Sequence, residues 1–513
     1  MKISGHALIG GVSVKGNGGT FCAFDPAKQE LMEPAITMVD EAQIDTACQL
    51  AGAAFDYFRS ISGQQRAVFL ETVAEEIIAL GDDLIVRAMA ESGLPRARLE
   101  GERGRTVGQL KLFADLLREG TWLDLRVDVP LPDRQPPRPE LRQRRIALGP
   151  VAVFAASNFP LAFSVAGGDT ASAFAAGCPV IVKAHSAHPG TSELVGRAIV
   201  LAVERCQLPS GVFALITGSG NGIGQALVRH PQIKAVGFTG SRSGGVALMA
   251  VAAARAEPIP VYAEMSSINP MMVLPNAMAH RAKTIAQGFA GSLTMGVGQF
   301  CTNPGLVLAL DNEQLTEFAQ AAVAALSEIP AATMLTAGIA GSYSRGIAVL
   351  SDQADVVTLL QTPNPACKGA AALFITKGAT FLEKHALRDE VFGPASLLVA
   401  CRDTAQMLEI IESLEGQLTA TIQMEPADLA LAQQLLPALE RKVGRILVNG
   451  FPTGVEVSSA MVHGGPYPAT SDGRSSSVGT AAIERFLRPV CYQNFPAELL
   501  PEAMRDANLS HTA

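Results

Sequence analysis

The chain has 513 residues, of which 48% are hydrophobic and 17% charged, and its formal net charge is -8. This length exceeds what one hydrophobic core usually supports, so we expect a large, multi-domain soluble enzyme with extensive buried surface, including subunit interfaces. The acidic balance argues against a nucleic-acid partner, because nucleic-acid surfaces concentrate Lys and Arg.

Neither the membrane nor the secretory pathway is indicated. No apolar run reaches the roughly 18 residues that a membrane helix needs. Residues 1–6 lack the basic start and apolar run of a secretory signal. The 8 cysteines form no Cys-x-x-Cys pair and no tight cluster typical of disulfide scaffolds or zinc sites. We therefore expect a cytoplasmic protein with reduced thiols, no membrane contact and no metal.

The chain begins with helices and continues as alternating strands and helices. In residues 41–119, apolar positions recur three and four apart, which predicts amphipathic helices. From Pro150, short apolar strands alternate with segments of helical length, as in parallel α/β sheets. The strands expected in a first sheet are 151–155, 180–183, 212–216, 235–238 and 259–262. Those expected in a second sheet are 271–274, 306–310, 373–375, 396–399 and 446–448.

The fold class is therefore α/β, with two open, Rossmann-like domains. The Pro-rich segment 130–139 and the strand-like segment 487–493 fit neither sheet. We expect them to form a small β arm that crosses to a neighbouring subunit. The expected division is a dinucleotide-binding domain of 1–125 and 147–263, a catalytic domain of 264–480, and an oligomerisation arm of 126–146 and 481–500.

Three strand ends are candidates for contacts with a dinucleotide. Residues 218–224 (GSGNGIG) lie between a strand and a helix, but Ile223 stands where the third glycine of the dinucleotide fingerprint belongs. A tight turn explains this run as well as a cofactor contact does. Residues 238–241 (FTGS) also precede a helix, whose N-terminal amides would bind a pyrophosphate. Lys183 ends another strand at the same sheet edge, although a solvated lysine would give the same pattern.

A cysteine and a distant glutamate carry the candidate chemistry. Cys301 lies in the run 298–305 (GQFCTNPG), and small and turn-forming residues of this kind are how a fold presents a nucleophile. Glu264 supplies a carboxylate, and the two residues together suggest covalent catalysis. Most buried cysteines only pack, so this pair needs the support of the rest of the chain.

Six ordered motifs resemble the aldehyde dehydrogenase superfamily, and the resemblance runs from about residue 20 to about residue 495. The motifs are 157–161 (SNFPL), 183–185 (KAH), 238–241 (FTGS), 263–265 (AEM), 298–301 (GQFC) and 390–394 (EVFGP). The runs 451–456 (FPTGVE) and 461–466 (MVHGGP) resemble the branches acting on α-ketoglutarate semialdehyde and, with NADP, on fatty aldehydes.

The resemblance implies a role for each site residue. Cys301 would attack the aldehyde carbon, the Asn158 amide and the Cys301 N–H would stabilise the oxyanion, and Glu264 would activate water to hydrolyse the thioester. The implied cofactor contacts are Lys183, Ser186, Gly240, Ser241, Glu390 and Phe392. A surface ion pair for Glu390 and a packing role for Phe392 are the alternatives.

Two departures from the family pattern bear on the cofactor. Ser186 stands where NAD-preferring members carry a glutamate, so a 2′-phosphate would meet no repulsion and NADP is expected, with NAD also accepted. His185 would contact that phosphate or remain a surface histidine. Ala156-Ser157 replaces the usual Pro-Trp, which leaves the contact on the nicotinamide side open.

The expected substrate is α-ketoglutarate semialdehyde, oxidised to 2-oxoglutarate. The aldehyde tunnel would be lined by Phe159, Phe163, Phe300 and Phe451, whose alternative role is core packing. Arg281 and Arg474 are the candidates for binding the far carboxylate. A fatty or other aliphatic aldehyde is the alternative substrate.

Two readings of a different class are a catalytically silent binding protein and a thiol-dependent acyl transferase. The complete set of Cys301, Glu264 and Asn158 argues against the first. No motif places a histidine with Cys301, which argues against the second. The resemblance further implies a homodimer or homotetramer.

Overall fold

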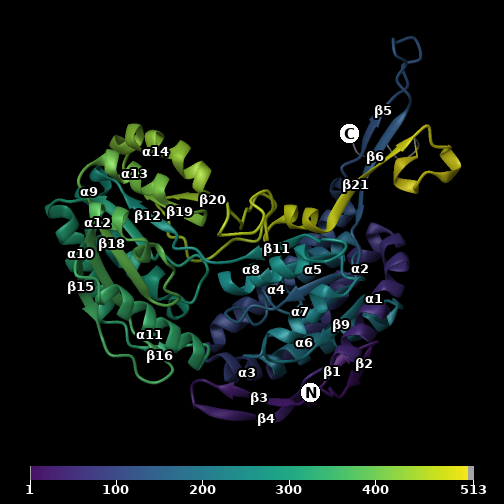
Figure 1. The fold of residues 1–513 in the computed structure, drawn as a ribbon, viewed down its shortest axis with the longest axis horizontal. Helices are drawn as coiled ribbons and strands as arrows, with labels where there is room; N and C mark the ends of the chain where they lie inside the picture. Colours follow the sequence, from purple (N-terminus) through teal and green to yellow (C-terminus); the bar gives the residue numbers. More distant parts are fainter. Residues whose placement is uncertain (1, 506–513) are drawn as a thin grey trace.

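The computed structural model describes residues 2–505 of the chain. Figure 1 shows two lobes, each with a sheet surrounded by helices, and a β ribbon that projects from the lobe holding the N-terminus. The expected α/β class with two largely parallel sheets is confirmed.

The first sheet has the strand order β11-β10-β7-β8-β9-β1-β2. Its parallel strands are β7 (Val151–Phe154), β8 (Val180–Lys183), β9 (Phe213–Ile216), β10 (Ala235–Thr239) and β11 (Val261–Glu264). Every residue of β7 and β9 is buried, as expected where helices cover both faces. The sequence did not predict the antiparallel hairpin of β1 (Ala7–Ile9) and β2 (Val12–Val14), which extends the sheet at one edge.

Helices surround this sheet. The region expected to be helical forms α1 (Glu41–Ser60), α2 (Gly63–Ala79), α3 (Gly81–Ser92) and α4 (Arg96–Glu119). The helices between the strands are α5 (Gly168–Ala176), α6 (Pro189–Arg205), α7 (Asn221–Arg229) and α8 (Arg242–Ala253). Asp40 and Ser62 begin α1 and α2 as parts of capping boxes, because each accepts a hydrogen bond from a backbone amide of the first turn.

The second sheet has the order β15-β17-β18-β13-β12-β19-β20, and all its neighbours are parallel except β15. Its strands are β12 (Pro270–Val273), β13 (Leu306–Leu310), β15 (Val356–Gln361), β17 (Ala372–Lys377), β18 (Ala395–Cys401), β19 (Gln417–Gln423) and β20 (Val443–Val448). Its helices are α9 (Pro275–Thr294), α10 (Glu313–Ser327), α11 (Ala337–Ser351), α12 (Gly378–Glu383), α13 (Thr404–Ser413) and α14 (Leu429–Lys442).

Three short sheets complete the fold. The projecting ribbon consists of β5 (Arg126–Asp128), β6 (Leu141–Ala147) and β21 (Leu487–Gln493), with β6 in the centre (Figure 1). Two further pairs are β3 (Thr20–Asp25) with β4 (Glu30–Thr37) and β14 (Ala332–Thr333) with β16 (Lys368–Gly369). Within residues 2–505, none of the helices combines the length and apolar character that crossing a membrane would require.

Candidate active site

The two sheets contribute the two groups singled out for chemistry. Glu264 is the last residue of β11 in the first sheet, and it forms an isolated bridge with Thr470. Cys301 follows the short 3-10 helix η3 (Met295–Gly298) and precedes β13 of the second sheet. The site therefore joins the two halves of the molecule.

The backbone before Cys301 has an unusual conformation that fixes the nucleophile. Gly296, Val297 and Gly298 have φ of +56°, +60° and +65°. This region suits glycine, but for the β-branched Val297 it costs about 1–3 kcal/mol. A Cβ at Gly298 would overlap the backbone of Gly393, so these two segments touch directly. The loop is thus held by packing in a geometry that it would not adopt alone.

The side chains of two asparagines also hold the loop that carries Cys301. The Asn269 amide donates to the carbonyls of Cys301 and Asn303, both at 2.8 Å. The Asn158 amide donates to the carbonyl of Gln299 at 3.1 Å, so it lies beside the nucleophile loop. The expected neighbours Cys301 and Asn158 are therefore brought together.

A histidine that the sequence analysis did not foresee joins the two catalytic candidates. His463 Nε2 lies 3.0 Å from Glu264 Oε1 and 3.4 Å from Cys301 Sγ, and the His463 side chain is only 2% exposed. Ser477 Oγ donates to the other oxygen of Glu264 at 2.9 Å. The expectation that no histidine accompanies Cys301 is wrong. Run 461–466 contains His463, but only the fold brings it to Cys301, 162 positions away.

Charges in this group are strongly coupled. Burial raises the pKa of Glu264, but the charge of His463 and hydrogen bonds from His463 and Ser477 outweigh it, so the pKa of Glu264 lies below its ordinary value. Burial and the adjacent Glu264 charge raise the pKa of the Cys301 thiol well above its ordinary value. The resting site therefore holds a thiol next to a carboxylate, and forming the thiolate requires a proton acceptor.

The same three side chains have metal-ligand spacing. One potential ligand atom each from Glu264, Cys301 and His463 lies within 4.8 Å of the others. A metal ion held there would occupy the sulfur lone pairs that attack on an aldehyde needs.

Three of the four expected tunnel aromatics form one cluster. The rings of Phe163 and Phe300 lie 5.1 and 5.2 Å from that of Phe159, both edge-to-face. The ring centroids of Phe163 and His463 are 6.2 Å apart. Phe451 is not brought to this cluster. It packs against α9, where a Cβ at Gly288 would overlap its ring.

Arg281 and Arg474, which were expected to bind the far carboxylate of the substrate, form ion pairs with acidic residues of the protein. Arg281 forms an ion pair with Glu425. Arg474 pairs with Asp472, and its side chain is 93% exposed. Neither contacts the aromatic cluster, so the expectation for both is not supported.

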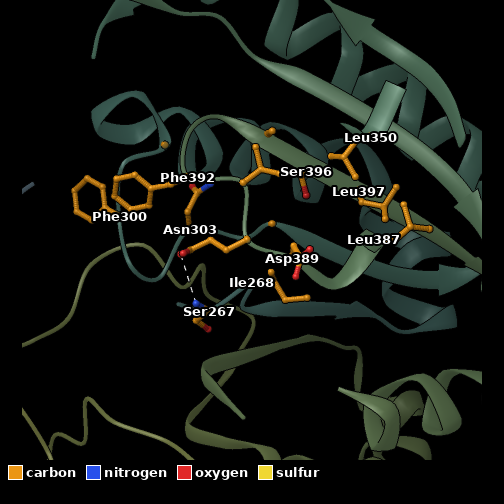
Figure 2. A pocket seen from close by; sticks show the side chains of 15 residues that line it. Ser267, Ile268, Phe300, Asn303, Leu350, Leu387, Asp389, Phe392, Ser396 and Leu397 are labelled. Atoms are coloured by element: carbon orange, nitrogen blue, oxygen red, sulfur yellow. Dashed lines mark hydrogen bonds between the residues drawn. The ribbon is translucent and has the colours of Figure 1, made fainter. Parts of the chain in front are cut away.

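A pocket next to the nucleophile contains Glu390 and Phe392. Figure 2 shows Phe300 and Phe392 at one end of this pocket and Leu387 at the other. The Ser267 amide donates to Glu390 Oε1 at 3.4 Å. Burial raises the pKa of Glu390 to about 8. Glu390 is thus part of a pocket and not of a surface ion pair.

A second pocket lies at the carboxyl ends of β7, β8 and β10. It is lined by Phe154, Ala155, Lys183, His185, Gly220, Asn221, Gly224, Gln225, Phe238, Thr239, Gly240, Ser241, Ser243, Gly244, Ala247 and Leu248. Ser241 begins α8 and accepts a hydrogen bond from the Gly244 amide at 3.2 Å. At Gly240 a Cβ would lie 2.7 Å from the Phe238 ring. A lysine, a helix N-terminus and a closely packed glycine suit a phosphate-bearing nucleotide.

Not all of the residues expected to contact the cofactor line this pocket. Burial lowers the pKa of Lys183 to about 8. His185 is not a surface histidine, because it lines the pocket and stacks on His188 at 5.5 Å, and burial lowers its pKa well below the ordinary value. Ser186 is exposed and is not among the lining residues. The glycine-rich run, which the sequence left open, contributes Gly220 and Gly224.

Comparisons with known proteins agree with this geometry. The model of the aldehyde dehydrogenase family matches residues 13–340. The chain is 57% identical to alpha-ketoglutaric semialdehyde dehydrogenase 2 of Azospirillum brasilense, covering 99% of this chain and 98% of that protein. It is 47% identical to alpha-ketoglutaric semialdehyde dehydrogenase of Acinetobacter baylyi, covering 99% and 97%. An NADP-dependent enzyme of E. coli has the same fold, with a TM-score of 0.82, 21% identity and coverage of 96% and 98%.

The chain therefore belongs to the aldehyde dehydrogenase family. It is an enzyme that oxidises aldehydes with NAD(P) as cofactor.

Proposed function

We propose that this enzyme oxidises α-ketoglutarate semialdehyde to 2-oxoglutarate, with Cys301 as nucleophile, Asn158 as oxyanion donor and Glu264 as general base. The two relatives named for this substrate are similar over nearly the whole chain, which supports the assignment. The observation that carries the mechanism is His463 Nε2, which lies within 3.4 Å of both the thiol and the carboxylate.

The first step is addition of the thiol to the aldehyde. The neutral His463, with its proton on Nδ1, accepts the Cys301 proton at Nε2, the C–S bond forms, and the carbonyl π electrons move to oxygen. The Asn158 amide and the Cys301 N–H stabilise that oxyanion. A nicotinamide bound in the pocket would accept the hydride that leaves this carbon as the C=O bond re-forms, which leaves the substrate as a thioester of Cys301.

The second step releases the product. Glu264 accepts a proton from water as its oxygen attacks the thioester carbon, and the C–S bond breaks to free the acid and the thiol. Because His463 and Ser477 outweigh the effect of burial and leave the pKa of Glu264 below its ordinary value, the carboxylate is in the basic form at neutral pH.

We propose NADP as the preferred cofactor, with NAD also accepted. Lys183, Gly240 and Ser241 would hold its phosphates and adenosine ribose, and Glu390 and Phe392 its nicotinamide half. The absence of an acidic side chain at Ser186 removes one source of repulsion against a 2′-phosphate.

The division of the chain into a dinucleotide-binding domain, a catalytic domain and an arm belongs to the same proposal. In the arm, β5 is an edge strand whose residues are all exposed, and Val127 is 38% exposed. An exposed edge with an apolar side chain favours pairing with another copy, so we propose a homodimer or homotetramer.

The test is the absorbance of reduced nicotinamide with purified enzyme, α-ketoglutarate semialdehyde or an alkyl aldehyde, and NADP or NAD. We expect the highest kcat/KM with the semialdehyde and NADP, and no signal from Cys301→Ala. A higher kcat/KM for long alkyl aldehydes would refute the substrate assignment, and a higher kcat/KM with NAD would refute the cofactor preference.

A further inference from the structure

Two arginines of α4 lie against the aromatic cluster of Phe159, Phe163 and Phe300, and a third arginine shares a loop with one of them. Arg98 and Arg105 lie two turns apart on α4 and therefore on one face of that helix. The Arg98 guanidinium lies 4.5 Å from the Phe159 ring centroid and 5.2 Å from that of Phe300. The Arg105 guanidinium lies 5.7 Å from the Phe163 ring centroid. The third, Arg445, comes from β20.

One loop brings Arg105 and Arg445 together. Arg105 donates to the carbonyl of Val455. Arg445 donates to the carbonyls of Pro452 at 2.7 Å and Gly454 at 3.0 Å. Both guanidinium groups are therefore anchored on residues 452–455: Arg105 donates through one terminal nitrogen and Arg445 through both, each time to a neutral backbone oxygen.

The charges of Arg105 and Arg445 are not neutralised by the protein. Arg98 forms a 2.7 Å ion pair with the buried Glu102, whereas neither Arg105 nor Arg445 forms an ion pair with any carboxylate between residues 2 and 505. Arg105 Nε and Nη2 and Arg445 Nε are buried and have no acceptor among the described residues. A buried charged donor without a partner is costly, so its retention calls for a functional explanation.

Arg105 and Arg445 lie close enough to Cys301 for its charge to affect their pKa values. Burial lowers the pKa of Arg105 and that of Arg445, and the negative charge of the Cys301 thiolate opposes the shift in each case. The charges of Glu102 and Glu456, like that of Cys301, raise the pKa of Arg105. A negatively charged group of the substrate, bound beyond the aldehyde carbon, would thus neutralise the positive charges of Arg105 and Arg445.

We infer that Arg105 and Arg445 form the subsite for the carboxylate at the far end of a short aldehyde acid. The inference rests on the proposed function and specifies how this site selects its substrate. The free N–H groups of the two guanidinium planes match the two oxygens of a carboxylate. An alkyl aldehyde would leave the buried donors unpaired, and sites built for polar groups discriminate strongly against analogues that lack them.

The test compares α-ketoglutarate semialdehyde with pentanal, an uncharged aldehyde of equal chain length, in Arg105→Met and Arg445→Met. We expect each substitution to lower kcat/KM for the semialdehyde by about 10²-fold, mainly through KM, and to leave or raise kcat/KM for pentanal. Arg105→Lys should restore part of the loss because it keeps the charge. Arg103→Met is the matched control on α4, since Arg103 donates to the carbonyl of Gly81.

Equal losses for both aldehydes, or an unchanged ratio of the two kcat/KM values, would overturn the subsite. A wild-type enzyme inactive on the semialdehyde but active on pentanal would instead refute the proposed function. Glutarate then tests the subsite separately. Competitive inhibition of pentanal oxidation that disappears in Arg105→Met supports it, and absence of inhibition in the wild type overturns it.

Discussion

Replacing His463 by glutamine would separate two roles of this side chain. His463 Nε2 accepts the Cys301 proton only in the neutral tautomer that is protonated at Nδ1, and it donates to Glu264 once it has taken that proton. A glutamine amide at the position of Nε2 can donate to Glu264, but it cannot accept the proton of Cys301. The imidazole can accept it, which gives a thiolate next to an imidazolium. His463→Gln therefore removes the proton acceptor while keeping the hydrogen bond.

The magnitude follows from the 3.4 Å separation of His463 Nε2 and Cys301 Sγ. Two opposite unit charges at this distance attract by about 5 kcal/mol at an effective dielectric constant of about 20. Loss of that attraction would raise the pKa of the Cys301 thiol further. We expect kcat/KM near neutral pH to fall by about 10²–10³-fold, within the range of general acid–base catalysis.

The assay measures the rate of Cys301 alkylation by iodoacetamide against pH, together with kcat/KM against pH. Because the substitution raises the pKa of Cys301, the midpoint of alkylation and the acidic limb of kcat/KM should both move to higher pH. His280→Gln is the matched control, since His280 is exposed and, among residues 2–505, its side chain bonds only to the carbonyl of Asn276. An unchanged alkylation midpoint with undiminished kcat/KM would refute the reasoning.

Three further predictions concern the base, the cofactor pocket and the nucleophile loop. Glu264→Gln should lower steady-state kcat by about 10²–10⁴-fold yet keep a burst of reduced nicotinamide equal to the enzyme concentration, measured by stopped flow; a loss of the burst would show that Glu264 is needed before hydride transfer. Glu390 has a folded-state pKa of about 8 against an ordinary 4.5, so its stabilising contribution is complete below pH 4.5 and is lost as pH rises through 8. Glu390→Gln should thus match the wild type near pH 5 and exceed it at pH 9 by up to about 4–5 kcal/mol in denaturant titrations of the apoenzyme, and an equal difference at both pH values would contradict this. Gly298→Ala should destabilise the protein by more than about 2 kcal/mol through its positive φ and the overlap with Gly393, whereas Gly291→Ala, with open space in α9, should be neutral or stabilising by thermal melting.

The sequence predicted most of the central strands, because both faces of these strands are covered and their residues are apolar. The inner strand β19 was missed, since its buried Gln and Thr residues interrupt the apolar pattern. A run such as 306–310, almost wholly buried, is apolar throughout and its limits are visible in the chain. The hairpin of β1 and β2 was missed, since β2 is a largely exposed edge strand without such a run. Motif order similarly placed Cys301, Glu264 and Asn158 in one site.

The missed residues share a different property. His463, Arg105 and Arg445 reach the site only through tertiary packing, and no local spacing connects them to Cys301. Arg105 and Val455, for example, are 350 positions apart. Exposure also cannot be inferred from residue type, which is why Arg474 was expected to bind the substrate although its side chain is 93% exposed.

The contact between Gly298 and Gly393 has a consequence for engineering. The Asn303 amide also donates to the carbonyl of Gly393 at 3.0 Å, so the nucleophile loop is packed closely against the segment carrying Glu390 and Phe392. Residue changes in one segment will alter the position of the other. Grafting a loop from a relative with a different cofactor or substrate should therefore succeed only when both segments are transplanted as one unit.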